Sequence, residues 1–212
     1  LLENSTLTNT GEIKISGSGK ERVGIYNEGT VDLQAGSKLE VSGEKSAAIY
    51  NKSTFNITGA TEIKATDGAM GVFSENGFVV STARNTLKIS TEGKGLGAYA
   101  KAGASVDLAE AEIDVQGGEA GVASYGASSV LDLAGGKLKY SGNGYALFSD
   151  GNGEINLRNS SVELRGNATL TELDYNLITT TAPTSRKIKF NNTDVKVYSN
   201  DVTGINVKNL GT

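Results

Sequence analysis

The chain contains no cysteine and no histidine, and it contains a single proline. The absence of Cys and His excludes disulfides, zinc sites of the usual kind, thiol nucleophiles and histidine-based triads. The missing Cys has two interpretations. One is chance in a chain rich in Ser, Thr and Gly. The other is secretion in an unfolded state, in which a premature disulfide would block passage through a membrane.

Long apolar runs and basic blocks are also missing from the sequence. No stretch of about 18 apolar residues is present, so we expect no membrane insertion by this chain. The first residues show no charged segment followed by an apolar one, so we see no signal peptide in the sequence as given. The net charge of −4 is spread over mixed signs. This argues against nucleic acid, or an anionic membrane surface, as the main partner.

What the chain does contain is a repeated motif, first seen as Val23-Gly24-Ile25-Tyr26-Asn27. Its copies follow at steps of 24, 23, 26, 24 and 25 residues. They occupy residues 23–27, 47–51, 70–74, 96–100, 120–124 and 145–149. A period in this range is typical of a solenoid, in which each repeat is one structural unit stacked on the previous one.

Each repeat also contains two triplets of the form apolar-polar-apolar. The first set is residues 31–33, 55–57, 78–80, 106–108, 131–133 and 155–157. The second set is residues 13–15, 39–41, 63–65, 87–89, 113–115, 138–140 and 162–164. Alternation with period two predicts strands with one buried face, and the Gly, Asn, Ser and Lys between them predict turns. We find no sustained helical periodicity.

Three short strands in each repeat predict an all-β fold, a parallel β-helix of about eight coils of 23–26 residues. At about 4.8 Å per coil, eight coils would be roughly 40 Å long. We assign residues 1–172 to coils one to seven, 173–187 to an insertion loop that holds the single proline, and 188–212 to an eighth coil of the same domain. Neither end has the polar cap usual in solenoids, so we expect a fragment of a longer helix.

Residues at equivalent positions of successive coils should form rows along the helix axis. We expect three inward rows from the repeated motif. They are Val23, Ala47, Met70, Leu96, Ala120 and Tyr145; Ile25, Ile49, Val72, Ala98, Val122 and Leu147; and Asn27, Asn51, Ser74, Ser124 and Ser149. The first two would supply apolar burial, and the third would hydrogen-bond along the axis.

Two outward rows carry charge. In the second triplet we expect Lys14, Glu40, Lys64, Lys88, Asp114, Lys139 and Glu163, with signs that alternate except where Lys64 lies beside Lys88. We interpret this row as a solvated ion-pair face. In the first triplet the row contains Asp32, Asn56, Asp107, Asp132 and Asn156. Asp107 and Asp132 are expected neighbours that could bind Ca²⁺ or act as an acid/base pair. We favour a structural role, because no further ligands or partner base are evident.

A third outward row is aromatic: Tyr26, Tyr50, Phe73, Tyr99 and Phe148, interrupted by Ala123. Beside it we expect an outward floor of small residues, Gly24, Ala48, Gly71, Gly97, Gly121 and Ala146. Exposed rings above such a floor would suit contact with sugar rings or with a protein. The alternative is that the rings stack on one another and only stabilise the sheet.

With its Gly-Ile-Tyr-Asn-type motif, its Leu-Glu-Val-Ser-Gly strand at residues 39–43 and its Cys-free coils, the chain resembles passenger domains of bacterial type V autotransporters. It is most similar to the very large fusobacterial outer-membrane adhesins. The resemblance implies a right-handed β-helix displayed on the cell surface and anchored to the outer membrane through a translocator barrel. It also favours the secretion interpretation of the missing Cys. The family has no shared catalytic motif.

We therefore expect a monomeric, surface-displayed adhesin segment that binds a protein or glycan on host or bacterial cells. The candidate contact residues are the aromatic row and, in the loop, Asn176, Leu177 and Ile178. We expect no enzyme activity, no cofactor and no metal. The alternatives are a carbohydrate-active β-helix enzyme, which would use Asp107 and Asp132, and a passive structural spacer.

Overall fold

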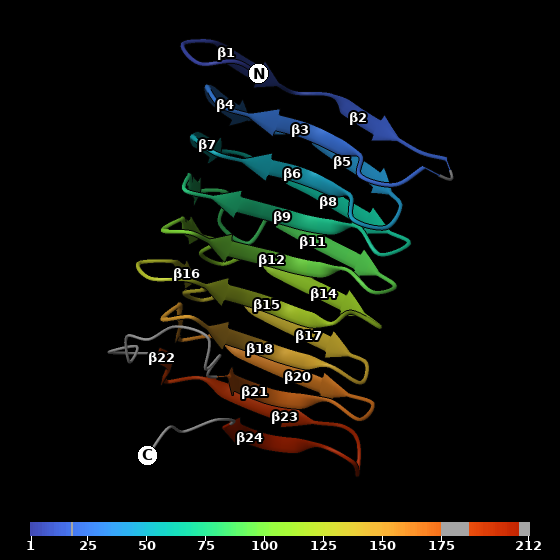
Figure 1. The fold of residues 1–212 in the computed structure, drawn as a ribbon, viewed down its shortest axis with the longest axis vertical. Helices are drawn as coiled ribbons and strands as arrows, with labels where there is room; N and C mark the ends of the chain where they lie inside the picture. The colour runs from blue at the N-terminus through green and yellow to red at the C-terminus, as the bar shows by residue number, and fades with distance from the viewer. Residues whose placement is uncertain (18, 175–186, 208–212) are drawn as a thin grey trace.

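The computed structural model describes residues 1–17, 19–174 and 187–207. Every helix-or-strand element in this part of the chain is a strand, and the strands form three sheets of eight. Each strand pairs in parallel with the strand three places later in the chain, so one coil contributes one strand to each sheet. Figure 1 shows the coils stacked along the long axis, with β1–β3 at one end and β22–β24 at the other. The predicted all-β parallel β-helix of eight coils is confirmed.

The three sheets are named here A, B and C. Sheet A contains β1 (Thr6–Asn9), β4 (Thr30–Leu33), β7 (Thr54–Ile57), β10 (Phe78–Ser81), β13 (Ser105–Asp107), β16 (Val130–Asp132), β19 (Glu154–Arg158) and β22 (Lys187–Asn191). Sheet B contains β2 (Glu12–Ile15), β5 (Ser37–Ser42), β8 (Thr61–Thr66), β11 (Leu87–Glu92), β14 (Glu112–Gln116), β17 (Lys137–Ser141), β20 (Ser161–Arg165) and β23 (Asp194–Val197). Sheet C contains β3 (Val23–Asn27), β6 (Ala47–Asn51), β9 (Met70–Glu75), β12 (Leu96–Lys101), β15 (Ala120–Tyr125), β18 (Tyr145–Asp150), β21 (Thr169–Asp174) and β24 (Thr203–Val207).

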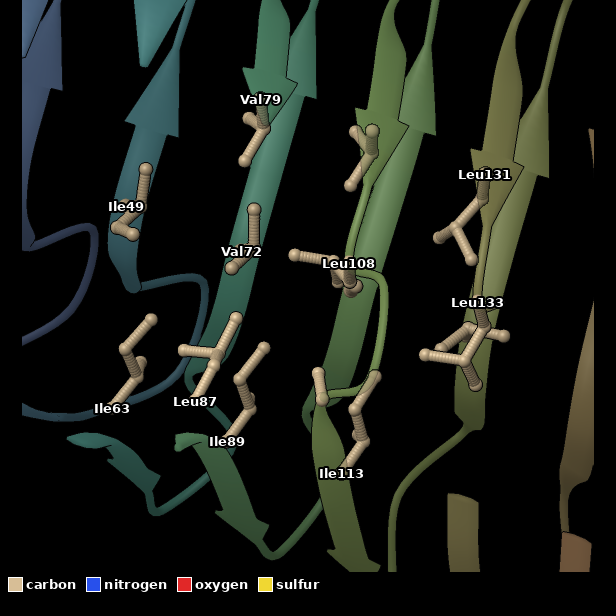
Figure 2. Close-up of a cluster of buried hydrophobic side chains, with 14 of the residues drawn as sticks. Ile49, Ile63, Val72, Val79, Leu87, Ile89, Leu108, Ile113, Leu131 and Leu133 are labelled. Carbon is tan, nitrogen blue, oxygen red and sulfur yellow. The ribbon is translucent and has the colours of Figure 1, made fainter. Parts of the chain in front are cut away.

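The inward side chains of the three sheets meet in one continuous apolar core. The expected row from Ile25 to Leu147 is buried along its whole length. Figure 2 shows the core from within, with Ile63, Ile89 and Ile113 side by side in successive coils. The coils between the two ends remove the same apolar positions from water, so burial stabilises them in a similar way. In the last coil Val197 and Ile205 remain exposed.

The inward polar row is also confirmed: Asn27, Asn51, Ser74, Ser124 and Ser149 are fully buried. The amide Nδ2 of Asn27 donates to Oδ1 of Asn51 at 2.8 Å, and Nδ2 of Asn51 donates to Oγ of Ser74 at 3.2 Å. These side chains lie where sheet C ends and the chain turns towards sheet A. Their amide groups satisfy backbone groups of that turn which a wholly apolar row would leave without partners.

The small-residue row points inward, so our placement of it as an outward floor is wrong. A Cβ added at Gly97 would lie 2.6 Å from Cγ2 of Ile113 in the core, and one at Gly71 would lie 2.6 Å from Cγ2 of Ile89. Strand alternation is broken here: the bridge partners run from Leu96 directly to Ala98. Two consecutive residues therefore face the core, and the first of them is Gly or Ala in each strand of sheet C from β3 to β18.

The same break moves the first expected core row outward. Of its members, only Ala47 and Ala120 are buried, while Val23, Met70, Leu96 and Tyr145 are half-buried. Since positions such as 24 and 25 both face inward, positions 23 and 26 on either side of them both face outward. The expectation that this row belongs to the core is wrong for its larger members.

The outward row of sheet B differs from our prediction at β11. Lys64 pairs with Ser90, and Lys88 pairs with Glu62. The prediction paired the triplet 87–89 with the triplet 63–65. In the structure β11 has a longer inward set, in which Thr91 follows Leu87 and Ile89, and the strand is therefore shifted relative to β8. The predicted contact between two lysines does not exist.

The insertion is shorter at both ends than residues 173–187. Strand β21 continues to Asp174, and Leu173 pairs with Ser149 and Val207. Strand β22 already begins at Lys187, which pairs with Glu154. The remaining residues, 175–186, lie outside the described part of the chain, and so do 208–212 at the end of the assigned eighth coil.

Candidate functional site

Four of the five predicted aromatic residues form one ladder on the outer face of sheet C. The rings of Tyr26 and Tyr50 meet edge to face, with centroids 5.2 Å apart. Tyr50 stacks on Phe73 at 4.7 Å, and Phe73 stacks on Tyr99 at 5.2 Å. The faces of the middle rings are therefore occupied by neighbouring rings. This arrangement agrees with the structural alternative, in which the rings stabilise the sheet themselves.

Phe148 lies apart from this aromatic ladder. Ala123 occupies the intervening coil and is only 2% exposed. Phe148 instead packs against Tyr145 of its own strand, with ring centroids 5.7 Å apart. This contact exists because the broken alternation turns Tyr145 outward. The other three predicted contact residues, Asn176, Leu177 and Ile178, lie outside the described residues.

A charged row runs beside the ladder, two residues after each ring. The phenol of Tyr26 donates to Oε1 of Glu28 at 2.7 Å, and the phenol of Tyr50 donates to Oε2 of Glu75 at 2.6 Å. Nζ of Lys52 lies 5.8 Å from the centroid of the Tyr26 ring and 5.7 Å from that of Tyr50. These contacts fix the ladder's polar edge by charge-assisted hydrogen bonds and cation–π attraction.

Two tyrosines of the ladder, Tyr50 and Tyr99, have raised pKa values. Burial, followed by the hydrogen bond to Glu75, raises the pKa of Tyr50 to about 12. Burial is also the main cause that raises the pKa of Tyr99 to about 12. The hydrogen bond from Tyr50 in turn lowers the pKa of Glu75, and Nζ of Lys101 adds to this from 3.0 Å. At Tyr50 a neutral phenol thus lies next to the ionised carboxylate of Glu75.

The two residues of the candidate acidic pair are neighbours, but both carboxylates already accept hydrogen bonds from other groups of the protein. Asp107 and Asp132 are bridge partners in adjacent strands. Asp132 pairs with Nη2 of Arg158 at 3.1 Å, and each carboxylate accepts a backbone N–H two residues further on, from Ala109 and Ala134. Partial burial raises the pKa of Asp107. Among residues 1–17, 19–174 and 187–207, no group of three or more acidic side chains is placed to hold a metal ion.

The outer face of sheet B is lined by ion pairs. Nζ of Lys14 lies 2.7 Å from Oε2 of Glu40, and Lys139 pairs with Glu112. Because Ser90 replaces a lysine beside Lys64, opposite charges are neighbours along most of this face. This supports the interpretation of the face as solvated, and solvent screening makes each exposed pair a weak contributor to stability.

A polar hollow that the sequence did not predict lies where the chain passes from sheet C to sheet A. Its volume is about 610 Å³. It is lined by Glu3, Asn4, Glu28, Gly29, Thr30, Lys52, Ser53, Glu75 and Asn76. The available signal was the charged residue two places after each aromatic, as in Tyr26 and Glu28. The sequence does not indicate the turn geometry that places residues of successive coils around one hollow.

The described part of the chain contains no helix long and apolar enough to cross a bilayer. Comparisons with protein families, with curated proteins and with solved structures give no match for this chain.

Proposed function

We propose that this chain is a rigid β-helical segment of a surface-displayed adhesin, acting first as a stalk. One observation carries the proposal: three parallel sheets, each of eight strands, run the length of the described structure. With seven steps of about 4.8 Å, the strands span roughly 34 Å along the axis. Stretching such a rod along its axis requires the separation of hydrogen-bonded strands in all three sheets.

The side-chain rows support this role because they repeat at every coil. The core is continuous, the turn between sheets C and A is hydrogen-bonded internally, and the outer face of sheet B is covered by ion pairs. The aromatic ladder adds ring-to-ring contacts between four coils. Each of these features stabilises the rod without any ligand.

The proposal includes a location and partners. The resemblance to autotransporter passengers and the absence of Cys fit secretion in an unfolded state and display at the cell surface. The partner would be a protein or glycan on a host or bacterial cell, and the outer face of sheet C would contact it. An enzymatic role is not proposed, because the acidic pair that suggested it is engaged by Arg158 and by backbone amides.

Single-molecule stretching of the purified chain tests the stalk role. A coil of 23–26 residues lengthens by roughly 80 Å when pulled out, at about 3.3–3.6 Å per residue. We expect abrupt steps that are multiples of this length, because each coil contacts only its neighbours. Smooth extension at low force, with no such steps, would show that the chain does not act as a rigid rod.

Binding of the labelled chain to host and bacterial cells tests the adhesin role. We expect saturable binding that Tyr26→Ala weakens while the melting transition stays close to that of the parent chain, since this ring is at the exposed end of the ladder. Phe78→Ala is a matched control, because Phe78 is an exposed ring on sheet A. No saturable binding to any cell would leave only the spacer role.

A further inference from the structure

The hollow between sheets C and A has the chemistry of a binding site. We propose that it binds the hydroxyl groups of an uncharged oligosaccharide. The inference rests on the proposed adhesin function, to which it adds a ligand class and a place. The hollow collects residues from four successive coils, from Glu3 before β1 to Asn76 before β10. Three steps of about 4.8 Å make it roughly 14 Å long, which suits an extended ligand.

Two carboxylates in the hollow are held in position and still have acceptor capacity. Glu28 and Glu75 each accept one phenol hydrogen, from Tyr26 and Tyr50 respectively. A carboxylate has about four acceptor positions, so positions remain on both residues after these bonds and the contact of Glu75 with Lys101. Sugar hydroxyls donate well to such fixed charged acceptors.

The charged residues that line the hollow disfavour ionic ligands. The lining contains the carboxylates of Glu3, Glu28 and Glu75 and only the ammonium of Lys52, so an anionic ligand is repelled. A cationic ligand meets a different obstacle. Lys52 already occupies the cation position over the rings of Tyr26 and Tyr50, and an incoming ammonium or guanidinium group would have to displace it. An uncharged polyol meets neither penalty.

The lining also offers donors and acceptors in the mixture that a sugar needs. Thr30 and Ser53 contribute hydroxyls, Asn76 contributes an amide, and Lys52 contributes ammonium hydrogens. Next to the hollow, Tyr26 is the end of the ladder and is 36% exposed. Its ring meets Tyr50 edge to face, in contrast to the stacked rings of Tyr50 and Phe73, so it has area left for the apolar face of a sugar.

The test begins with the full 212-residue chain on an array of neutral, sialylated and sulfated oligosaccharides, together with a basic peptide. We expect binding to one or more neutral oligosaccharides, and affinity for the best of them is then measured by calorimetry. Glu28→Gln keeps the shape of the side chain but removes the charged acceptor. Loss of hydrogen bonds to a charged group corresponds to a decrease in affinity of about tenfold or more. Glu62→Gln on the outer face of sheet B is the matched control and should leave affinity unchanged.

Three results would overturn the inference. Preference for acidic saccharides or for the basic peptide would contradict the charge argument. Binding of a neutral oligosaccharide that Glu28→Gln does not weaken would place the site elsewhere. Saturable binding to cells with no binding to any neutral oligosaccharide would refute the sugar ligand and retain the adhesin function. Unchanged melting curves for both variants keep these outcomes separate from a failure to fold.

Discussion

Asn51 should be the most sensitive polar position in the core. Its Nδ2 donates to the carbonyl of Ser53 at 2.9 Å, to Oγ of Ser74 at 3.2 Å and to the carbonyl of Phe78 at 3.1 Å. Its Oδ1 accepts from Nδ2 of Asn27 at 2.8 Å and from the amide of Ser53 at 3.2 Å. Asn51→Ala removes all of these bonds, and water does not replace them because the residue is fully buried. Each buried group left without a partner costs about 1–3 kcal/mol, so we expect a loss of about 3 kcal/mol in the free energy of unfolding.

Urea denaturation followed by circular dichroism measures this loss. Asn51→Ser is the informative comparison, because serines occupy the same row at Ser124 and Ser149, where their hydroxyls donate to backbone carbonyls at 3.0 and 2.8 Å. We expect Asn51→Ser to lose roughly half as much, since one hydroxyl replaces part of the amide's bonding. If Asn51→Ala unfolds within about 0.5 kcal/mol of the parent chain, as ordinary surface substitutions do, the amide row is not what holds this turn.

Three other measurements test particular residues. Gly97→Ala places a Cβ 2.6 Å from Ile113 and 2.7 Å from the carbonyl oxygen of Gly121, so we expect a loss of about 1–3 kcal/mol from overpacking. Gly11→Ala, where a Cβ meets nothing within 4 Å, should stabilise by a few tenths of a kcal/mol through chain entropy; equal effects in urea denaturation would show that the small-residue row is not tightly packed. Thr91→Val should stabilise by about 1 kcal/mol, because Oγ1 of Thr91 is buried without a hydrogen-bond partner, and a destabilised variant would imply a partner for that hydroxyl. The folded chain retains the Tyr50 proton up to a pKa of about 12, against the ordinary value of 10.0, so its contribution is complete below pH 10.0 and is lost as the pH rises towards 12. In alkaline unfolding experiments Tyr50→Phe should show a smaller decline over this range, and an identical decline would contradict the raised pKa.

Most of the fold was predictable because each coil repeats the same local pattern. The triplets at residues 31–33 and 39–41 alternate with period two, and the structure places both in strands with their apolar ends inward. The buried polar row was predictable for the same reason, since Asn27 and Asn51 occupy one position of the repeat. The repeat therefore gave the inward and outward positions in most coils. The prediction was wrong for residues 78–80, where Val79 is buried and Phe78 and Val80 are exposed, because three apolar residues in a row do not indicate which of them face inward.

The errors occurred where the backbone departs from the repeat. Lys88 was misplaced because an apolar triplet fits two registers of β11 equally well, and only strand pairing distinguishes them. The prediction placed Gly97 and its equivalents on the outer face because it assumed strict alternation. At this position two consecutive residues face the core. The hollow depends on how four separate turns lie side by side, which no single repeat encodes.

Residues that pair in neighbouring strands are one coil apart in the sequence, and this spacing has an evolutionary consequence. Thr54 pairs with Phe78, so deletion of residues 54–77 would remove one whole coil and join two segments that already occupy equivalent positions. The ring of Tyr50 would then be adjacent to the ring of Tyr99, and the aromatic ladder would continue with one ring fewer. Duplication of the same segment would insert a coil. Such a chain can change its length in units of about 4.8 Å by recombination between its own repeats, while each surviving coil keeps a neighbour of the same kind.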